Sequence, residues 1–199
     1  LSALNIATAA NTYNTAVGSS AGAALTTGTI NTYIGGKAGS TSDTAGSNVA
    51  VGYDSLALNT KGGNNVAVGE SALYTLNITT AAVTYNVAMG HHAGVSVTTG
   101  TQNTLIGGLA GDALTDADFN VAVGLHALGA DTLGSKSTAL GYQALASQNF
   151  TTATESLNTA VGYNSGVAVS TGIQNTFVGS LAGDATTTIQ QLVLKQLSY

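Results

Sequence analysis

A short alternation of polar and apolar positions recurs ten times along the chain. Nine copies begin with Asn and one with Ser; each continues with Thr or Val, a variable residue, an aliphatic residue and Gly, and has Ala or Ser three positions after the Gly. The copies begin 17 or 21 residues apart, at Asn14, Asn31, Asn48, Asn65, Asn86, Asn103, Asn120, Ser137, Asn158 and Asn175. β-Branched residues that alternate over a few positions and end at Gly predict a short β-strand and a turn in every copy.

A longer, 72-residue superperiod is superimposed on this repeat. It consists of three shorter steps and one longer step, so that residues 94–112 match residues 166–184. One short strand cannot bury its apolar side alone, so such units stack on their neighbours. We therefore predict an all-β fold, a parallel β-solenoid (β-roll) of about ten coils of 17–21 residues, which occupies residues 1–184. Residues 185–199 lose the motif and are expected to form a cap, a neck or an assembly segment.

Glycine occupies the fifth motif position in every copy. The ten residues are Gly18, Gly35, Gly52, Gly69, Gly90, Gly107, Gly124, Gly141, Gly162 and Gly179. Ten independent choices of Gly indicate a positive φ, or a backbone approached too closely for a Cβ atom. The aliphatic residue before each glycine, such as Val17 or Ile34, is expected to point into the core.

Asparagine occupies the first motif position in nine of the ten copies, with Ser137 as the exception. Stacked coils place these side chains one above another, where each amide can bond to the next and to turn backbone. We interpret the column as a structural ladder. A column that binds a polar ligand is the alternative.

Composition and charge exclude several classes of function. The net charge is −5 with four Lys and no Arg, so the basic footprint of a nucleic-acid-binding protein is missing. There is no Cys, which removes disulfides and thiolate metal sites, and no apolar run reaches the length of about 18 residues that membrane insertion needs. No cofactor is expected.

No enzyme site emerges from the motifs. Residues 18–22 (GSSAG) match the spacing of a nucleophile elbow, but other copies carry other residues there, and no cluster of carboxylates with Lys or Arg exists. His91 and His92 are adjacent, and neighbours in an extended segment point to opposite sides. Asp112, Asp116 and Asp118 lack the Gly spacing of a calcium loop and are expected to lie in a solvated loop. We expect no metal site.

Large aromatic residues at regular motif positions are candidates for contact with a partner. Tyr33 and Phe177 occupy the third position, and Tyr53, Tyr142 and Tyr163 follow motif glycines. Exposed rings often recognise sugars or proteins. The alternative is that these rings fill gaps at a seam of the solenoid or of a trimer.

Two sequons lie one superperiod apart, inside the 21-residue coils. They begin at Asn77 and Asn149, where the four additional residues are expected to bulge outward. Such an outward loop suits glycosylation, although Thr-rich loops also produce sequons by chance.

The repeated segments NVAVG, NTAVG and NTLIG resemble the YadA-like head repeats of trimeric autotransporter adhesins and similar repeats of bacteriophage tail fibres. The resemblance covers ten motifs and most of the chain. It implies a left-handed parallel β-roll that assembles as a homotrimer on a cell or virion surface and takes part in attachment.

These expectations define a function and an alternative. The first is a non-enzymatic structural or adhesion module of an extracellular fibre, with its own copies and a host-surface glycan or protein as partners. The alternative is a filament subunit that stacks head to tail through open solenoid ends, because an uncapped end leaves backbone groups unpaired. A fixed trimer favours the first, and rods that grow with concentration favour the second.

Overall fold

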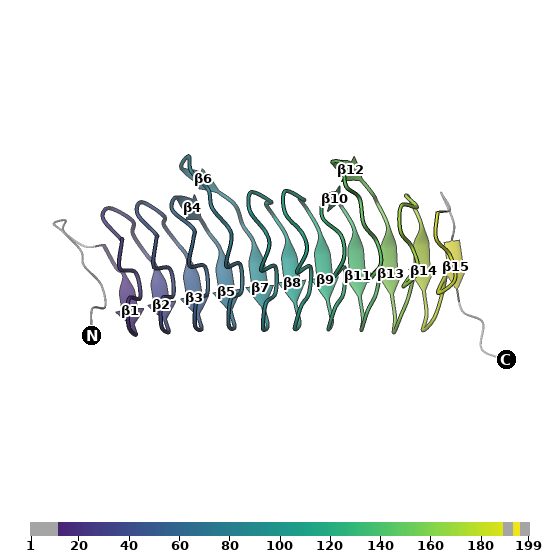
Figure 1. The fold of residues 1–199 in the computed structure, drawn as a ribbon, viewed down its shortest axis with the longest axis horizontal. Coiled ribbons are helices and arrows are strands. Elements are labelled where there is room, and N and C mark those ends of the chain that lie inside the picture. Colours follow the sequence, from purple (N-terminus) through teal and green to yellow (C-terminus); the bar gives the residue numbers. More distant parts are fainter. Residues whose placement is uncertain (1–11, 189–192, 196–199) are drawn as a thin grey trace.

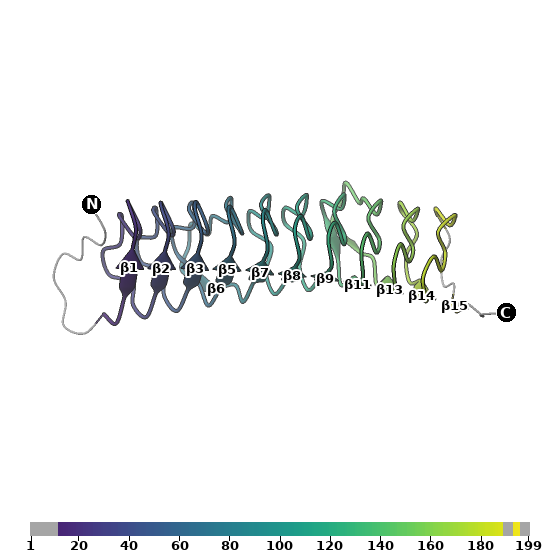
Figure 2. The same cartoon turned by 90° about the horizontal axis from the view of Figure 1, so that it is seen from below.

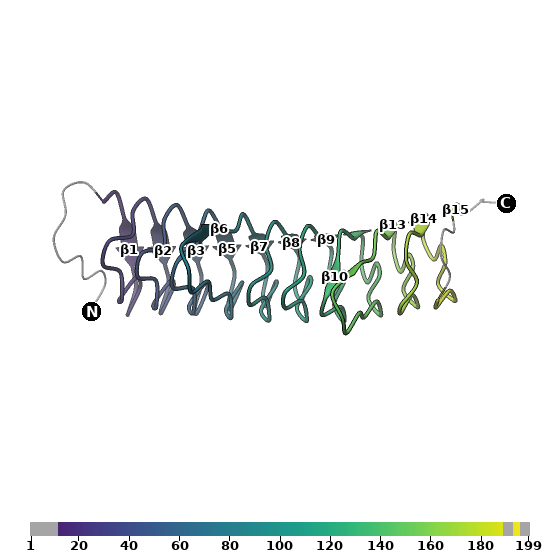
Figure 3. The same ribbon diagram turned by 90° about the horizontal axis from the view of Figure 1, so that it is seen from above.

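The computed structural model describes residues 12–188 and 193–195, which contain no helix. They form a parallel β-solenoid of about ten coils, which confirms the predicted fold class (Figure 1). The coils succeed one another along a single long axis, as the views from below and above also show (Figures 2 and 3). The molecule is therefore a rod whose neighbouring coils are consecutive in sequence.

One sheet of eleven parallel strands runs along the rod. Its strands, in spatial order, are β1 (Thr15–Val17), β2 (Thr32–Ile34), β3 (Val49–Val51), β5 (Val66–Val68), β7 (Val87–Met89), β8 (Thr104–Ile106), β9 (Val121–Val123), β11 (Thr138–Leu140), β13 (Thr159–Val161), β14 (Thr176–Val178) and β15 (Val193–Lys195). Each of the first ten occupies motif positions two to four. The eleventh continues the same register, because Thr176 pairs with Val193. Apart from β15, the predicted end segment beyond Thr188 lies outside the described residues.

The two longer coils carry small additional sheets. β4 (Gly62–Gly63) pairs with β6 (Ala82–Val83), and β10 (Gly134–Ser135) pairs with β12 (Thr154–Glu155). The loops with β6 and β12 project beyond the neighbouring coils (Figure 1). The main sheet keeps its register there, since Val66 still pairs with Val87. The additional residues are thus accommodated in loops away from the sheet.

The strands face the opposite way from our expectation. The side chain at the third motif position points inward and is buried in nine of the ten copies, and Ala16 in the first is partly buried. The aliphatic residue at the fourth position, which we expected in the core, lies outside: Val17 is 57% exposed and Ile34 is 39% exposed. The period of two in a strand fixes only that positions three and four face opposite sides. Which side becomes the core is decided by how the coil closes.

Tyr33 and Phe177 are therefore buried core residues, so their candidate role in contact with a partner is wrong, and burial agrees with the alternative that they fill space within the solenoid. Their size is matched by glycine at the ninth motif position. A Cβ atom on Gly39 would lie 2.7 Å from the Tyr33 ring, and one on Gly166 would lie 2.9 Å from the Phe177 ring. Where the ninth position is Leu, the third is Ala, as in the pair of Leu56 with Ala50, both buried. One large third-position side chain fills the space beside two successive glycines, as Phe177 does beside Gly166 and Gly183, which explains why Gly and Leu alternate in pairs along the chain.

The Tyr33 hydroxyl is also satisfied inside the core. It lies 2.9 Å from Ser42 Oγ, with which it forms a hydrogen bond. Burial raises the pKa of the Tyr33 phenol, because desolvation disfavours the phenolate. Tyr33 is therefore a neutral hydrogen-bonding core residue.

The asparagines at the first motif position form a hydrogen-bonded column along the rod. Asn31 shows the pattern: its backbone N–H donates to Asn14 Oδ1 at 2.8 Å, and its own Nδ2 donates to Ala45 O at 2.8 Å. Its Oδ1 accepts from the backbone N–H of Asn48 at 3.0 Å. An amide of this kind thus connects two coils and supports a turn in its own coil, whereas Asn65 Nδ2 donates to Gly63 O of the preceding coil at 3.3 Å. The column therefore holds the stack together from inside.

The serine that interrupts the column is compensated by a glutamine. The backbone N–H of Ser137 donates to Asn120 Oδ1 at 2.9 Å, as an asparagine would. Gln148 enters the core beside it, donates to Ser137 Oγ at 2.9 Å and accepts from Asn158 Nδ2 at 2.8 Å. Leu76 occupies the equivalent position one superperiod earlier. The amide lost at Ser137 is therefore supplied by Gln148.

Candidate functional site

The outer face of the main sheet is an apolar strip. Its fourth-position side chains are exposed or half-buried in every coil: Val17, Ile34, Val51, Val68, Met89, Ile106, Val123, Leu140, Val161 and Val178. Thr or Val at the second position lies beside them on the same face. We call these two columns the outer strip. The sequence analysis missed the outer strip because it expected the fourth-position side chains to point into the core.

The size of the outer strip distinguishes it from scattered surface residues. Ten strands spaced about 4.8 Å apart give a length of about 45 Å, and two columns of side chains give a width of about 10 Å. The strip therefore covers on the order of 500 Å², and its continuous apolar part is the fourth-position column, because Thr occupies six of the ten second positions. The outer strip is therefore a candidate site of association.

The tyrosines that follow motif glycines are exposed at the turn after the strand. Tyr53 is 52% exposed, and Tyr142 and Tyr163 stack at 5.3 Å between ring centroids with an interplanar angle of 9°. The Lys37 ammonium lies 5.6 Å from the centre of the Tyr53 ring. Hydrogen bonding to Tyr53 raises the pKa of Lys37, which stays charged. The three rings follow one line along the rod, here called the tyrosine ridge.

The projecting loops expose both sequon asparagines. Asn77 and Asn149 have accessible side chains whose Oδ1 atoms accept hydrogen bonds from Thr60 and Thr132, at 3.1 and 3.2 Å. The residue after each asparagine is buried and anchors its loop. A glycan on either Nδ2 would therefore extend away from the rod.

An open groove lies beside each projecting loop. The first has a volume of about 520 Å³ and includes Gly46, Lys61 and Val83 in its lining. The second, one superperiod later, has a volume of about 230 Å³ and contains the ion pair between Lys136 and Glu155. The two grooves share their position but not their side chains, so they do not form a repeated binding site.

A further groove of about 380 Å³ lies along the coils that contain Asp112, His126 and Gln143. Asp112 Oδ1 is buried and has no hydrogen-bond partner among the described residues. Burial raises the pKa of this carboxyl, and a backbone hydrogen bond, followed by the nearby His126 and His92, lowers it by less. Asp112 does not gather with Asp116 and Asp118, whose carboxylates bond to Thr99 and Thr101 in the preceding coil.

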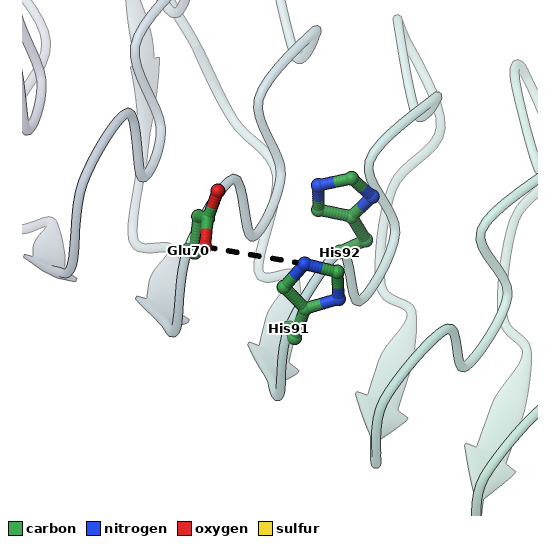
Figure 4. Close-up of side chains that lie close together, drawn as sticks. All are labelled: Glu70, His91 and His92. Carbon is green, nitrogen blue, oxygen red and sulfur yellow. Dashed lines mark ion pairs between the residues drawn. The ribbon is translucent and has the colours of Figure 1, made fainter.

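His91 and His92 lie on the same side of the chain, which corrects the expectation that they point apart. Their rings stack with centroids 4.0 Å apart and an interplanar angle of 9°. Glu70, from the preceding coil, reaches the same point: its Oε2 lies 4.0 Å from His91 Nε2 (Figure 4). One potential ligand atom from each of the three residues lies within 4.8 Å of the other two. Among the described residues this is the one such group of three His, Asp or Glu side chains.

The spacing of the repeat contained the signal for Glu70. Glu70 and His91 both occupy the sixth motif position of consecutive coils, so stacking makes them neighbours although they are distant in sequence. The sequence does not indicate that His91 and His92 lie side by side, because their arrangement depends on the backbone conformation of the turn.

Comparisons with known proteins assign no family to this chain. No family model, no curated protein and no solved structure matches it. No helix that could cross a membrane occurs in residues 12–188 or 193–195. The function is therefore inferred from the surfaces described above.

Proposed function

We propose that this chain is a non-enzymatic structural and adhesion module of an extracellular fibre, on a cell surface or a virion, and that it assembles as a homotrimer. The observation that supports it is the continuous outer strip. The resemblance of the NVAVG-type repeats to trimeric adhesin heads and tail-fibre repeats points the same way. The 72-residue superperiod spaces the projecting loops along such a fibre.

Further copies of this chain are the occupant that best fits the outer strip. The strip runs nearly the full length of the rod, and a partner of equal length and equal periodicity covers all of it. Three strips brought together bury on the order of 1,500 Å² in total, about 500 Å² for each pair of chains, so the strip forms the apolar centre of the proposed interface and side chains beside it supply the rest of the area that a stable interface needs. Closed rotational symmetry uses the same patch on every copy and leaves no strip exposed.

The tyrosine ridge is the proposed contact with a host-surface glycan or protein. It lies at the turn beyond each strand, so a trimer held through the outer strip leaves it accessible. Exposed tyrosines provide flat apolar area with a polar tip, which suits sugar rings and protein loops.

The trimer is tested by measuring the mass in solution by light scattering over a range of concentrations. We expect a constant mass of about three times the 19.5 kDa chain. The double variant Met89→Glu/Ile106→Glu places two carboxylates on adjacent strands of the outer strip, where they would have to be desolvated in the interface. The mass of this variant should fall to that of one chain.

Leu125→Glu is the matched control for this measurement. Leu125 is 46% exposed, comparable with Met89 at 43%, but it lies at the sixth motif position, outside the strip. It should leave the trimer intact, and circular dichroism should show an unchanged sheet in both variants. A wild-type monomer, or a trimer that persists in the strip variant, would contradict the proposal.

Attachment is tested separately, on the trimer and an array of immobilised host-surface glycans and matrix proteins. The variant Tyr142→Ser/Tyr163→Ser should lose at least about tenfold in affinity for whichever probe the wild type binds, the equivalent of about 1.4 kcal/mol. Tyr85→Ser is the control, because Tyr85 is 54% exposed but lies outside the ridge. Equal losses in both variants, or no binding to any probe, would count against attachment through the ridge.

A second candidate is a filament subunit that stacks head to tail. The observation in its favour is that β1 and β15 terminate the main sheet, each with one hydrogen-bonded neighbour among the described residues. In the same light-scattering measurement this function would give rods whose mass grows with concentration, and the strip variant would not prevent their growth.

A further inference from the structure

We infer that Glu70, His91 and His92 bind a divalent transition-metal ion of the Zn²⁺ class on the surface of the rod. This inference rests on residues of a single chain and does not depend on the proposed fibre function. Two coils contribute to the site: Glu70 follows β5, and the histidines follow β7.

The turn after β7 brings the two imidazoles together. Gly90 has a φ of 144° and His92 a φ of 56°, so the chain reverses its direction within three residues. In an extended segment consecutive side chains would diverge. Here the rings stack with their centroids 4.0 Å apart, and both lie beside Glu70 (Figure 4).

The stacking of the coils delivers the carboxylate. Val68 pairs with Met89, which fixes the two turns side by side, and Glu70 then lies against His91. The side chains of Glu70 and His91 are each 58% exposed, so both can rotate and an ion can reach them. No large movement of the backbone is needed.

The distances fit an ion once one imidazole rotates out of the stack. Zn²⁺ binds imidazole nitrogen and carboxylate oxygen at about 2.0–2.2 Å, so two ligand atoms of one tetrahedral ion are about 3.3 Å apart. The potential ligand atoms of these three residues all lie within 4.8 Å of one another. Drawing them together requires shifts on the order of 1 Å and rotation of one imidazole out of the stack, because two parallel rings cannot both direct an in-plane lone pair at one ion. The His91 side chain is 58% exposed and has room for this rotation.

The donor set defines the class of ion. Two imidazoles and one carboxylate suit Zn²⁺, Ni²⁺, Cu²⁺ and Co²⁺, whereas Ca²⁺ and Mg²⁺ prefer oxygen ligands throughout. Three protein ligands leave the fourth tetrahedral position for water or for a group from another molecule. The site would therefore cross-link two adjacent coils while remaining open to solvent.

The test is titration of the full chain, without a polyhistidine tag, with Zn²⁺ by calorimetry and with Co²⁺ by visible absorption. The chain has three histidines, so His126→Ala is a matched control: His126 lies at the same motif position as His92, two coils away. We expect binding of one ion per chain, with a Co²⁺ spectrum typical of tetrahedral coordination. His91→Ala and His92→Ala should each weaken binding about 100-fold or more, and Glu70→Gln at least about tenfold.

His126→Ala should leave both affinity and spectrum unchanged. All four variants change surface side chains, and circular dichroism should show that the sheet is retained. Absence of binding by the wild type, an equal loss in His126→Ala, or an unchanged affinity in Glu70→Gln would each overturn the three-residue site. None of these outcomes affects the mass measurement that tests the trimer.

Discussion

Replacing Gly107 by alanine is expected to break the solenoid into two parts that unfold separately. Gly107 has a φ of 129°, a conformation that L side chains rarely adopt, and an added Cβ would lie 2.6 Å from the carbonyl oxygen of Gly124 in the next coil. Because the added Cβ would collide with the backbone of Gly124 and not with a flexible side chain, the two coils must move apart to accommodate it. We expect a loss of about 4 kcal/mol or more, a size confined to a few mechanisms such as this one.

Because Gly107 lies near the middle of the rod, its substitution is expected to affect the cooperativity of unfolding as well as the local stability. A solenoid is stabilised by contacts between nearest neighbours, so a broken interface near the middle uncouples the coils on its two sides. Urea denaturation followed by circular dichroism should therefore change from one transition to two. Hydrogen exchange should accelerate first in the amides that join β8 to β9.

The adjacent glycine is the control for this variant. Gly108 has an ordinary φ, and an added Cβ would meet the flexible side chain of Leu125 at 3.2 Å. Other coils carry Ser19, Tyr53 or Glu70 at the equivalent position. Gly108→Ala should therefore behave like the wild type. A single transition at nearly unchanged urea concentration in Gly107→Ala would show that the stacked glycines are not required.

Replacing Gln148 by leucine is expected to cost about 3 kcal/mol, although leucine occupies the equivalent position 76. The Gln148 amide donates to Asp131 Oδ2 at 2.5 Å and to Ser137 Oγ at 2.9 Å. Asp131 is fully buried, and its other oxygen already accepts from two backbone N–H groups. Removing the partner of a buried carboxylate oxygen leaves it without compensation, which is strongly destabilising.

The equivalent positions one superperiod earlier indicate which further substitutions should restore the stability lost in Gln148→Leu. One superperiod earlier, the equivalents of Asp131, Ser137 and Gln148 are Asn59, Asn65 and Leu76. Asn59 exchanges two hydrogen bonds with Gly62, so an amide suits this position as well as a carboxylate. The triple variant Asp131→Asn/Ser137→Asn/Gln148→Leu reproduces the earlier set and should recover most of the lost stability. The test is the free energy of unfolding from urea denaturation, and a triple variant as unstable as Gln148→Leu would refute the compensation.

Several features of the fold could be predicted from the sequence because they depend on periodicity. The strand at motif positions two to four, the stacking of coils and the displacement of additional residues into loops follow from the spacing of Asn14, Asn31 and their successors. A repeat read in register leaves one way to stack its units. The same register would have placed Glu70 beside His91, had the sixth position been compared between coils.

The orientation of each strand could not be obtained in this way. Both Ala at position three and Val at position four are apolar, so the alternation does not identify the inner side. The structure decides it through core volume: the coil is narrow, and Ala fits inside unless a neighbouring Gly makes room for Tyr33 or Phe177. This decision moves the larger aliphatic residues outward and creates the outer strip.

The sequence by itself determined a rod of stacked coils, its period, and the columns of asparagine and glycine. Consecutive coils have the same motif, so each adopts the same local structure and equivalent residues stack. Only the tertiary structure decided which side of the sheet is exposed and which side chains of different coils meet. Those outcomes depend on the closure of each coil and on φ at single turn residues such as His92. The sequence pattern of polar and apolar residues determines neither coil closure nor these φ angles. The outer strip depends on the first, and the group of Glu70, His91 and His92 depends on the second.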